Sequence, residues 1–163
     1  MDVFNIVAGL ASIGSAIFAF FQAKKALAAA KEAKQVEKNI THHRTTSDIS
    51  KLKEKADSLL SQISVYGFGG HPTKYQAADH DSNSEGIQNF TMKVREFESC
   101  FTEKIKNEVT ALIEDIDTEL GKFNTAQITD ENRKESGRII MAKVNMVNSK
   151  FKSVLDRKVE KGT

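Results

Sequence analysis

Apolar and polar positions divide the chain into an apolar beginning and a strongly polar remainder. Val3 to Ala23 is a run of 21 residues without a charged side chain, and it contains four phenylalanines. The hydrocarbon core of a bilayer is about 30 Å thick, and about 20 helical residues cross it. We therefore expect a transmembrane helix. The strong helix formers that follow predict a helical cytoplasmic extension as far as Lys38, so that residues 1–38 form one element.

Two other interpretations of the apolar segment stay open. A soluble core helix needs a partner surface that covers all its sides, and a cleaved signal peptide carries its positive charge before the apolar run. Here Asp2 precedes the run. Lysines follow it at the juxtamembrane positions Lys24, Lys25, Lys31 and Lys34. Because basic residues favour the cytoplasmic side, we expect the N-terminus outside the membrane and the body in the cytoplasm.

Small and uncharged polar residues recur along one face of this predicted helix. They are spaced alternately by three and four positions, and we call them the polar seam: Asn5, Ala8, Ser12, Ser15, Ala19, Gln22 and Ala26. Small residues let helices approach closely in lipid, and Ser, Asn and Gln side chains hydrogen-bond across such a contact. We interpret the seam as a self-association surface and, if many copies assemble, as a pore lining. An Ala-rich helix with incidental small residues is the alternative.

The remaining sequence predicts further helices, so the expected fold class is all-α. Residues 39–47 are polar and β-branched and predict a linker after the N-terminal helix. Residues 48–163 carry apolar side chains at helical spacing and predict a cytoplasmic bundle of about three helices. Residues 66–86 hold both tyrosines and the only proline. They predict a flexible loop in the bundle, with a partner-binding loop as the alternative.

The last two long helices are expected to pair as an antiparallel hairpin. The first follows a capping-box spacing of Ser82 and Glu85 and extends without interruption to Phe123. The second begins after Thr129, which is a suitable N-cap. The first helix is acidic near its end and the second is basic near its start, so we expect these charges to lie close together across the turn.

Composition and motifs argue against catalysis, metal binding and nucleic-acid binding. The formal net charge is only +2, so nucleic acid is not an expected partner. Cys100 is the only cysteine, so one chain has neither an intrachain disulfide nor a cysteine-based zinc site. We expect Cys100 to be a small buried residue of the core. His42 and His43 are adjacent in the sequence and therefore point to different helix faces, so they are poorly placed to bind one metal ion together. We expect no catalytic residue, no metal and no cofactor, although a nucleic-acid-processing enzyme remains a third interpretation.

The layout nevertheless resembles a known group of proteins. An apolar N-terminal helix with a Lys-rich exit, "GLASIGSAIFAFFQAKKA" (Gly9 to Ala26), followed by a body of long helices, is similar to small membrane effectors of bacterial antiphage and CRISPR systems. Their bodies resemble HEPN domains. HEPN ribonucleases carry an Arg with a His a few positions later. No Arg of this chain has such a His: Arg44, Arg95, Arg133, Arg138 and Arg157. No catalytic residue is therefore carried over.

These observations lead to two functional expectations. The first is a non-enzymatic membrane protein that homo-oligomerises through its N-terminal helix and forms a pore in a defence context. The alternative is a membrane-tethered adaptor whose helical bundle binds a cytoplasmic partner protein. The two differ in whether the apolar segment tolerates replacement by another anchor.

Overall fold

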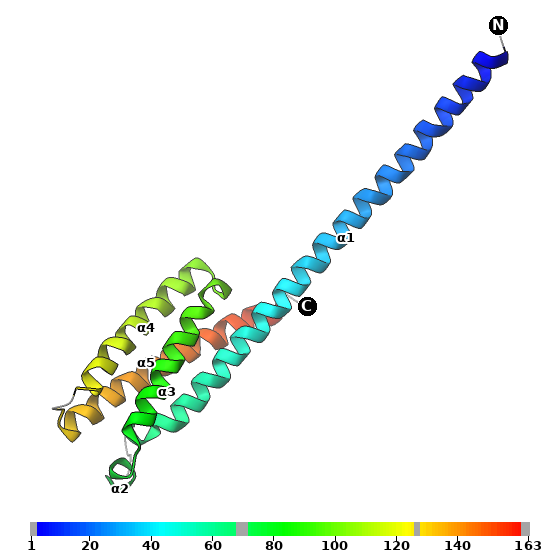
Figure 1. Cartoon of the computed structure of the whole chain (residues 1–163). Coiled ribbons are helices and arrows are strands. Elements are labelled where there is room, and N and C mark those ends of the chain that lie inside the picture. Colours follow the sequence, from blue (N-terminus) through cyan, green and yellow to red (C-terminus); the bar gives the residue numbers. More distant parts are fainter. Residues whose placement is uncertain (1–2, 68–71, 126–127, 161–163) are drawn as a thin grey trace. The chain divides into compact units, whose positions relative to one another are not determined.

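The computed structural model is all-helical over the residues that it describes (Figure 1). The backbone is described for residues 3–67, 72–125 and 128–160, and the side chains for these residues apart from 3–17, 72 and 158–160. This confirms the all-α prediction. The chain divides into two compact units, Met1–Arg44 and Thr45–Thr163.

Helix α1, Val3–Gln62, continues through the segment that the sequence predicted as a linker. The predicted break at residues 39–47 is therefore wrong, and so is the separate helix start near Ser47. Thr and Asn each cost at most about 0.7 kcal/mol in a helix relative to Ala, and neither Gly nor Pro occurs between Gly14 and Gly67. The low-propensity residues are thus too weak to end the helix. The division between the two units nevertheless falls at Arg44, inside the predicted linker.

In the first unit, residues 18–44 of α1 are exposed on every side of the helix. A search of the described residues finds no helix with a stretch apolar and long enough to traverse a bilayer. The side chains of residues 3–17, which make up most of the predicted span, lie outside that description.

The second unit begins with the end of α1, which passes into the 3₁₀ helix η1, Ile63–Tyr66. A short helix, α2, occupies Pro72–Gln76, and α3 extends over His80–Glu96. The prediction of a flexible loop over residues 66–86 is therefore wrong for much of that range.

The start of α3 also differs from the predicted capping box. Asp79 is the N-cap, and its Oδ1 accepts a hydrogen bond from the backbone N–H of Ser82 at 2.9 Å. A carboxylate at this position satisfies one of the free N–H groups of the first turn and favours the positive end of the helix. Because Asp79 acts in place of Ser82, the helix begins earlier than predicted.

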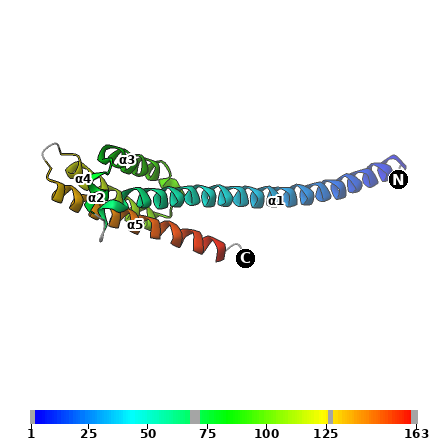
Figure 2. The same ribbon diagram turned by 90° about the horizontal axis from the view of Figure 1, so that it is seen from below.

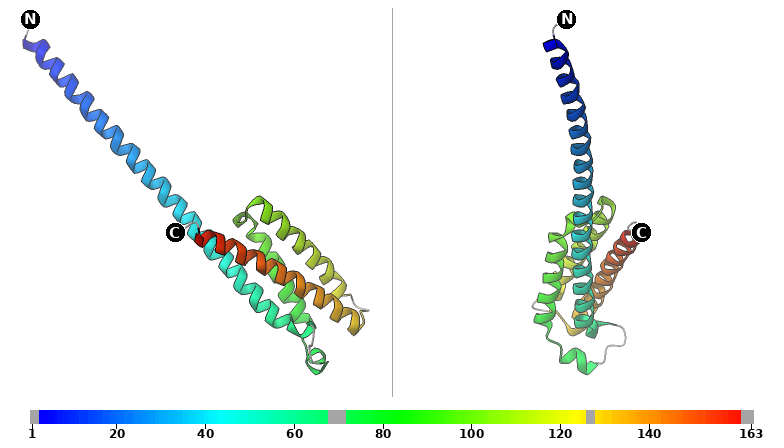
Figure 3. Two further views of the ribbon diagram at one scale, coloured as in Figure 1. Left: turned by 180° about the vertical axis from the view of Figure 1, so that it is seen from behind. Right: turned by 90° about the vertical axis from the view of Figure 1, so that its right-hand side faces the viewer.

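The predicted single helix up to Phe123 is interrupted. Helix α3 ends at Glu96, the 3₁₀ helix η2 spans Glu98–Cys100, and α4 occupies Glu103–Phe123. The interruption lets α3 fold back against α4, as two views of the second unit show (Figures 2 and 3). It also brings the ring of Phe101 into a stacked contact with Phe151, with the ring centroids 5.7 Å apart. An unbroken helix would leave its two apolar stripes without a common core.

Helices α4 and α5, Asp130–Glu160, form the predicted antiparallel hairpin. Two ion pairs show that the helices are antiparallel: Lys143–Asp115 and Lys150–Glu108, each 2.5 Å long. The residue numbers increase along α5 from the first pair to the second, whereas they decrease along α4. The charges that were expected to lie close together across the turn form no ion pair with one another among the described residues: Asp117 pairs with Arg95 of α3, and Arg138 with Glu135 of its own helix. Exposed pairs of this kind are individually weak.

The sequence also identified the start of α5 correctly. Thr129 precedes the helix, and its Oγ1 accepts a hydrogen bond from the backbone N–H of Asn132 at 3.3 Å. Asp130 and Glu131 follow in the first turn, where their charge complements the helix dipole. This cap fixes the direction in which the chain enters α5.

The core of the second unit is apolar and contains the predicted stripes. Its largest fully buried side chains are Tyr66, Phe123, Phe151, Ile49, Leu52, Ile63, Ile87, Ile113, Ile116, Ile140, Val94 and Val109. Burial of each such side chain stabilises the unit by about 1.5–3 kcal/mol. Every described α-helix of this unit except α2, whose Tyr75 is also buried, contributes to that set, as does the 3₁₀ helix η1. The helices that frame the site described below are thus held by one continuous core.

Candidate functional site

The structure describes the side chains of only three of the seven polar-seam residues. Ala19, Gln22 and Ala26 are exposed, which leaves them free to contact another molecule. The other seam residues lie outside the described side chains: Asn5, Ala8, Ser12 and Ser15. The four lysines that follow the apolar run are all exposed: Lys24, Lys25, Lys31 and Lys34.

Large apolar side chains on the same part of α1 are also exposed. Phe18, Phe20 and Phe21 are 65%, 59% and 58% exposed. Lys24 places its Nζ 5.2 Å from the centre of the Phe20 ring, a cation–π distance. The rings of Phe20 and Phe21 are in contact, with their centroids 6.3 Å apart. Three phenylalanines so close in sequence that are each more than half exposed are typical of a surface that contacts lipid or protein.

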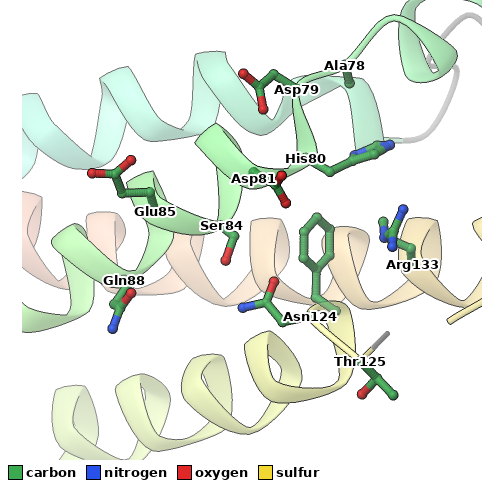
Figure 4. Close-up of a pocket in the computed structure, with 11 residues that line it drawn as sticks. Ala78, Asp79, His80, Asp81, Ser84, Glu85, Gln88, Asn124, Thr125 and Arg133 are labelled. Atoms are coloured by element: carbon green, nitrogen blue, oxygen red, sulfur yellow. The ribbon is translucent and has the colours of Figure 1, made fainter. Parts of the chain in front are cut away.

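A second candidate site lies in the second unit, where α3 begins and α4 gives way to α5. The pocket has a volume of about 760 Å³, within the range of small-molecule sites. Figure 4 shows its residues. His80 and Arg133 lie at one end of the view, and Glu85 and Gln88 lie at the other. The pocket is therefore lined by both charge signs, with Glu85 far from Arg133 and the Asp81 side chain between Glu85 and His80.

A hydrogen-bond chain inside the core orients the histidine. The Asn83 side-chain amide donates to the hydroxyl of Tyr66 at 2.9 Å, and this hydroxyl lies 2.7 Å from Nδ1 of His80. We assign the phenol as the donor to the imidazole, because Nδ1 is its described partner besides Asn83 and the buried proton then has an acceptor. Nδ1 of His80 is then an acceptor, and Nε2 carries the ring proton.

The aromatic surroundings keep both members of this chain neutral. The Tyr66 ring makes edge contacts with Tyr75 and Phe123, at centroid distances of 5.9 Å and 5.3 Å. Burial raises the pKa of Tyr66 to about 12. Burial, and secondarily the positive charge of Arg133, lower the pKa of His80 below its ordinary 6.5. At neutral pH the imidazole is therefore an uncharged donor.

Arg133, near the start of α5, is the basic side chain of the pocket. Its guanidinium carbon lies 6.0 Å from the centre of the Phe123 ring. Its Nε is shielded from solvent and has no hydrogen-bond partner among the described residues. By contrast, Arg95 and Arg138 of the same unit are paired with Asp117 and Glu135.

Sequence reasoning missed this pocket. Its chemistry comes from Tyr66, His80 and Arg133, which lie far apart in the chain and share no spacing pattern. The only sequence signal is the concentration of both tyrosines and two of the four histidines in residues 66–86. Cys100 is partly buried and packs against the core. The described side chains contain no cluster of three or more His, Cys, Asp or Glu that could hold a metal ion.

Comparison with known proteins assigns no family to the chain. No protein-family model, no curated protein and no solved structure matches it.

Proposed function

We propose that the chain is a non-enzymatic membrane-anchored protein that assembles with copies of itself through the N-terminal part of α1. The observation that carries the proposal is the uncharged run from Val3 to Ala23. Its described end exposes three phenylalanines, Phe18, Phe20 and Phe21, on a helix whose residues 18–44 are exposed on every side. An apolar helix in this state needs lipid or another protein around it.

Lipid is the better environment for this segment. Moving a phenylalanine from water into an apolar surrounding is favourable by about 1.5–3 kcal/mol, and the lysines from Lys24 onward suit the headgroup region on the cytoplasmic side. The layout resembles antiphage membrane effectors, which suggests the bacterial inner membrane as the setting. In that orientation the helical bundle lies in the cytoplasm.

Self-association follows from the polar seam. Hydroxyl and amide side chains that face lipid are costly, whereas a hydrogen bond between helices contributes about 0.6–2 kcal/mol. The seam therefore favours helix–helix contact, and the exposed Ala19, Gln22 and Ala26 continue it beyond residues 3–17. A ring of copies would turn the seam towards a common axis, where it would line a weakly polar pore.

The seam can be tested with a matched pair of variants of the full chain. In the first, Ser12, Ser15 and Ala19 are replaced by Leu, which fills the seam and keeps the segment apolar. In the second, Phe20 and Phe21 are replaced by Leu, which changes residues off the seam. We expect the first variant to disperse the assembly in mild detergent, as measured by light scattering, and the second to keep it. An unchanged mass in the seam variant would contradict the proposal.

The adaptor is the second candidate, and exposed methionines favour it. Met92 of α3 and Met146 of α5 are 58% and 50% exposed, and methionine is common on adaptable binding surfaces. Exchange of residues 3–23 for an unrelated apolar anchor separates the candidates. The leading proposal predicts that the exchange abolishes self-association. The adaptor predicts that the exchanged chain still recovers the same partner protein, and that Met92→Glu or Met146→Glu prevents this.

A further inference from the structure

The pocket in the second unit holds an arginine that the fold leaves without a counter-ion. Arg133 has no ion pair to any described residue, and its Nε is buried without a hydrogen bond. Its guanidinium lies over the Phe123 ring, which fixes its place but does not neutralise its charge. A guanidinium has five N–H donors in a planar fork that matches a carboxylate or a phosphate. Nothing among the described side chains uses that fork.

A second donor faces the same part of the pocket. His80 lines the pocket, and its ring centre is 6.1 Å from that of Phe123, the ring that also contacts Arg133. The hydrogen-bond chain from Asn83 through Tyr66 to Nδ1 leaves Nε2–H as the free donor of the imidazole. Tyr66 is fully buried, so the core fixes this tautomer. An anionic group at this end would meet one charged fork and one neutral N–H donor.

Carboxylates line the rest of the pocket. Asp79 is used as the cap of α3. Asp81 and Glu85 make no hydrogen bond or ion pair with another residue that the structure describes. Figure 4 shows Glu85 at the end of the pocket opposite to Arg133. These carboxylates repel a polyanion, and they attract an ammonium group that lies near them.

We propose that this pocket binds a small soluble zwitterion. Its carboxylate or phosphate pairs with Arg133 and the Nε2–H of His80, and its ammonium group faces Asp81 and Glu85. An unpaired guanidinium and the unpaired carboxylates of Asp81 and Glu85 within the same volume of about 760 Å³ carry the proposal, because neither a simple anion nor a simple cation satisfies both. The inference is independent of the membrane anchor and of self-association.

The experiment uses the full chain in mild detergent and five probes. Phosphoethanolamine and γ-aminobutyrate carry both charges, with a phosphate or a carboxylate as the anion. Inorganic phosphate, acetate and ethylamine carry one charge each. Binding is measured by calorimetry and by the NMR signal of the His80 imidazole. We expect one of the zwitterions to bind at least about tenfold more tightly than the single-charge probes and to shift the Nε2 resonance of His80. The zwitterion that binds more tightly identifies the anion that the site prefers.

Matched variants distinguish the pocket from general surface charge. Arg133→Gln is expected to weaken binding of the zwitterion about tenfold or more, and Glu85→Gln several-fold. Lys134→Gln and Glu131→Gln change neighbouring charges that do not line this pocket, and they are expected to leave binding unchanged. Near-UV circular dichroism of the tyrosines checks that each variant is folded.

Three results would overturn the proposal. The first is that no probe binds to the unaltered chain or shifts its His80 resonance. This result does not depend on the folding of any variant. The second is that phosphate or acetate alone binds as tightly as the zwitterions. The third is that Lys134→Gln weakens binding as much as Arg133→Gln.

Discussion

Replacement of Gly137 by Ala tests the packing around the pocket most sharply. A Cβ atom added to Gly137 of α5 would lie 2.5 Å from Cγ, 2.8 Å from Cδ1 and 2.9 Å from Cβ of Tyr66. Carbon atoms do not approach so closely without a shift of one partner. Tyr66 is fully buried and hydrogen-bonded to Asn83 and His80, so its ring cannot shift without disturbing these contacts.

The magnitude follows from two opposing effects. Overpacking of a core costs about 1–3 kcal/mol, and three contacts shorter than 3 Å place Gly137→Ala at the upper end. Ala is favoured over Gly inside a helix by about 1 kcal/mol. We expect a net loss of about 2 kcal/mol. Gly121 of α4 is the matched control, because a Cβ atom there meets nothing within 4 Å. Gly121→Ala should therefore stabilise the protein by up to about 1 kcal/mol.

The assay is urea unfolding of the full chain, followed by near-UV circular dichroism. The chain has two tyrosines and no tryptophan, and both Tyr66 and Tyr75 are buried in the second unit. The tyrosine band of the spectrum therefore reports on that unit alone. If Gly137→Ala were as stable as the unaltered chain, the close contact between α5 and Tyr66 would be wrong.

Three further predictions concern the second unit. Phe151→Ala removes a fully buried ring and should cost about 3–5 kcal/mol in urea unfolding, whereas Met146→Ala at a half-exposed position should change stability little; equal effects would contradict the core. The pKa of His80 is lowered below 6.5 in the folded protein, so the unfolded chain binds more protons than the folded chain below about pH 6.5, and stability should fall as the pH drops from there. His80→Gln should flatten this dependence. An unchanged pH profile in that variant would exclude His80 as its source. The hydrogen bond from Lys150 lowers the pKa of Glu108, and Lys150→Gln should raise it towards 4.5 in an NMR titration; an unmoved titration would show that the pair does not form.

Periodicity was sufficient to predict the elements whose apolar stripes are long and regular. The buried face that runs from Ile49 of α1 to Ile63 of η1 and the pairing of α4 with α5 follow from spacing alone. The start of α5 was equally predictable, because Thr129 and the two acidic residues after it form a local N-terminal signal. In these places local preference and tertiary packing favour the same structure.

The errors arise where local preference is weak and packing decides. Residues 39–47 contain poor helix formers but no breaker, and the helix continues through them. At the end of α3, the apolar spacing continues through Phe97 and Phe101, which conceals the interruption. Thr102 and Glu103 form a weak start signal for α4, and the apolar stripe has the same period on both sides of it, so spacing alone does not reveal the break.

The pocket was beyond sequence reasoning for a different reason. Its donors depend on a buried contact between Tyr66 and His80 and on the position of Arg133 one helix away. A tautomer and an unpaired guanidinium are properties of the folded core. They leave no spacing pattern in a single sequence.

The mass and location of the full-length protein test the central proposal most directly. Cells that produce the chain are fractionated, and the fraction that contains the protein is extracted with mild detergent. The protein mass of the extracted complex is then measured by light scattering. We predict that the chain sediments with the membranes and that its complex has several times the 18.1 kDa of one copy. A chain that stays in the supernatant without detergent, with the mass of a single copy, would contradict the proposal.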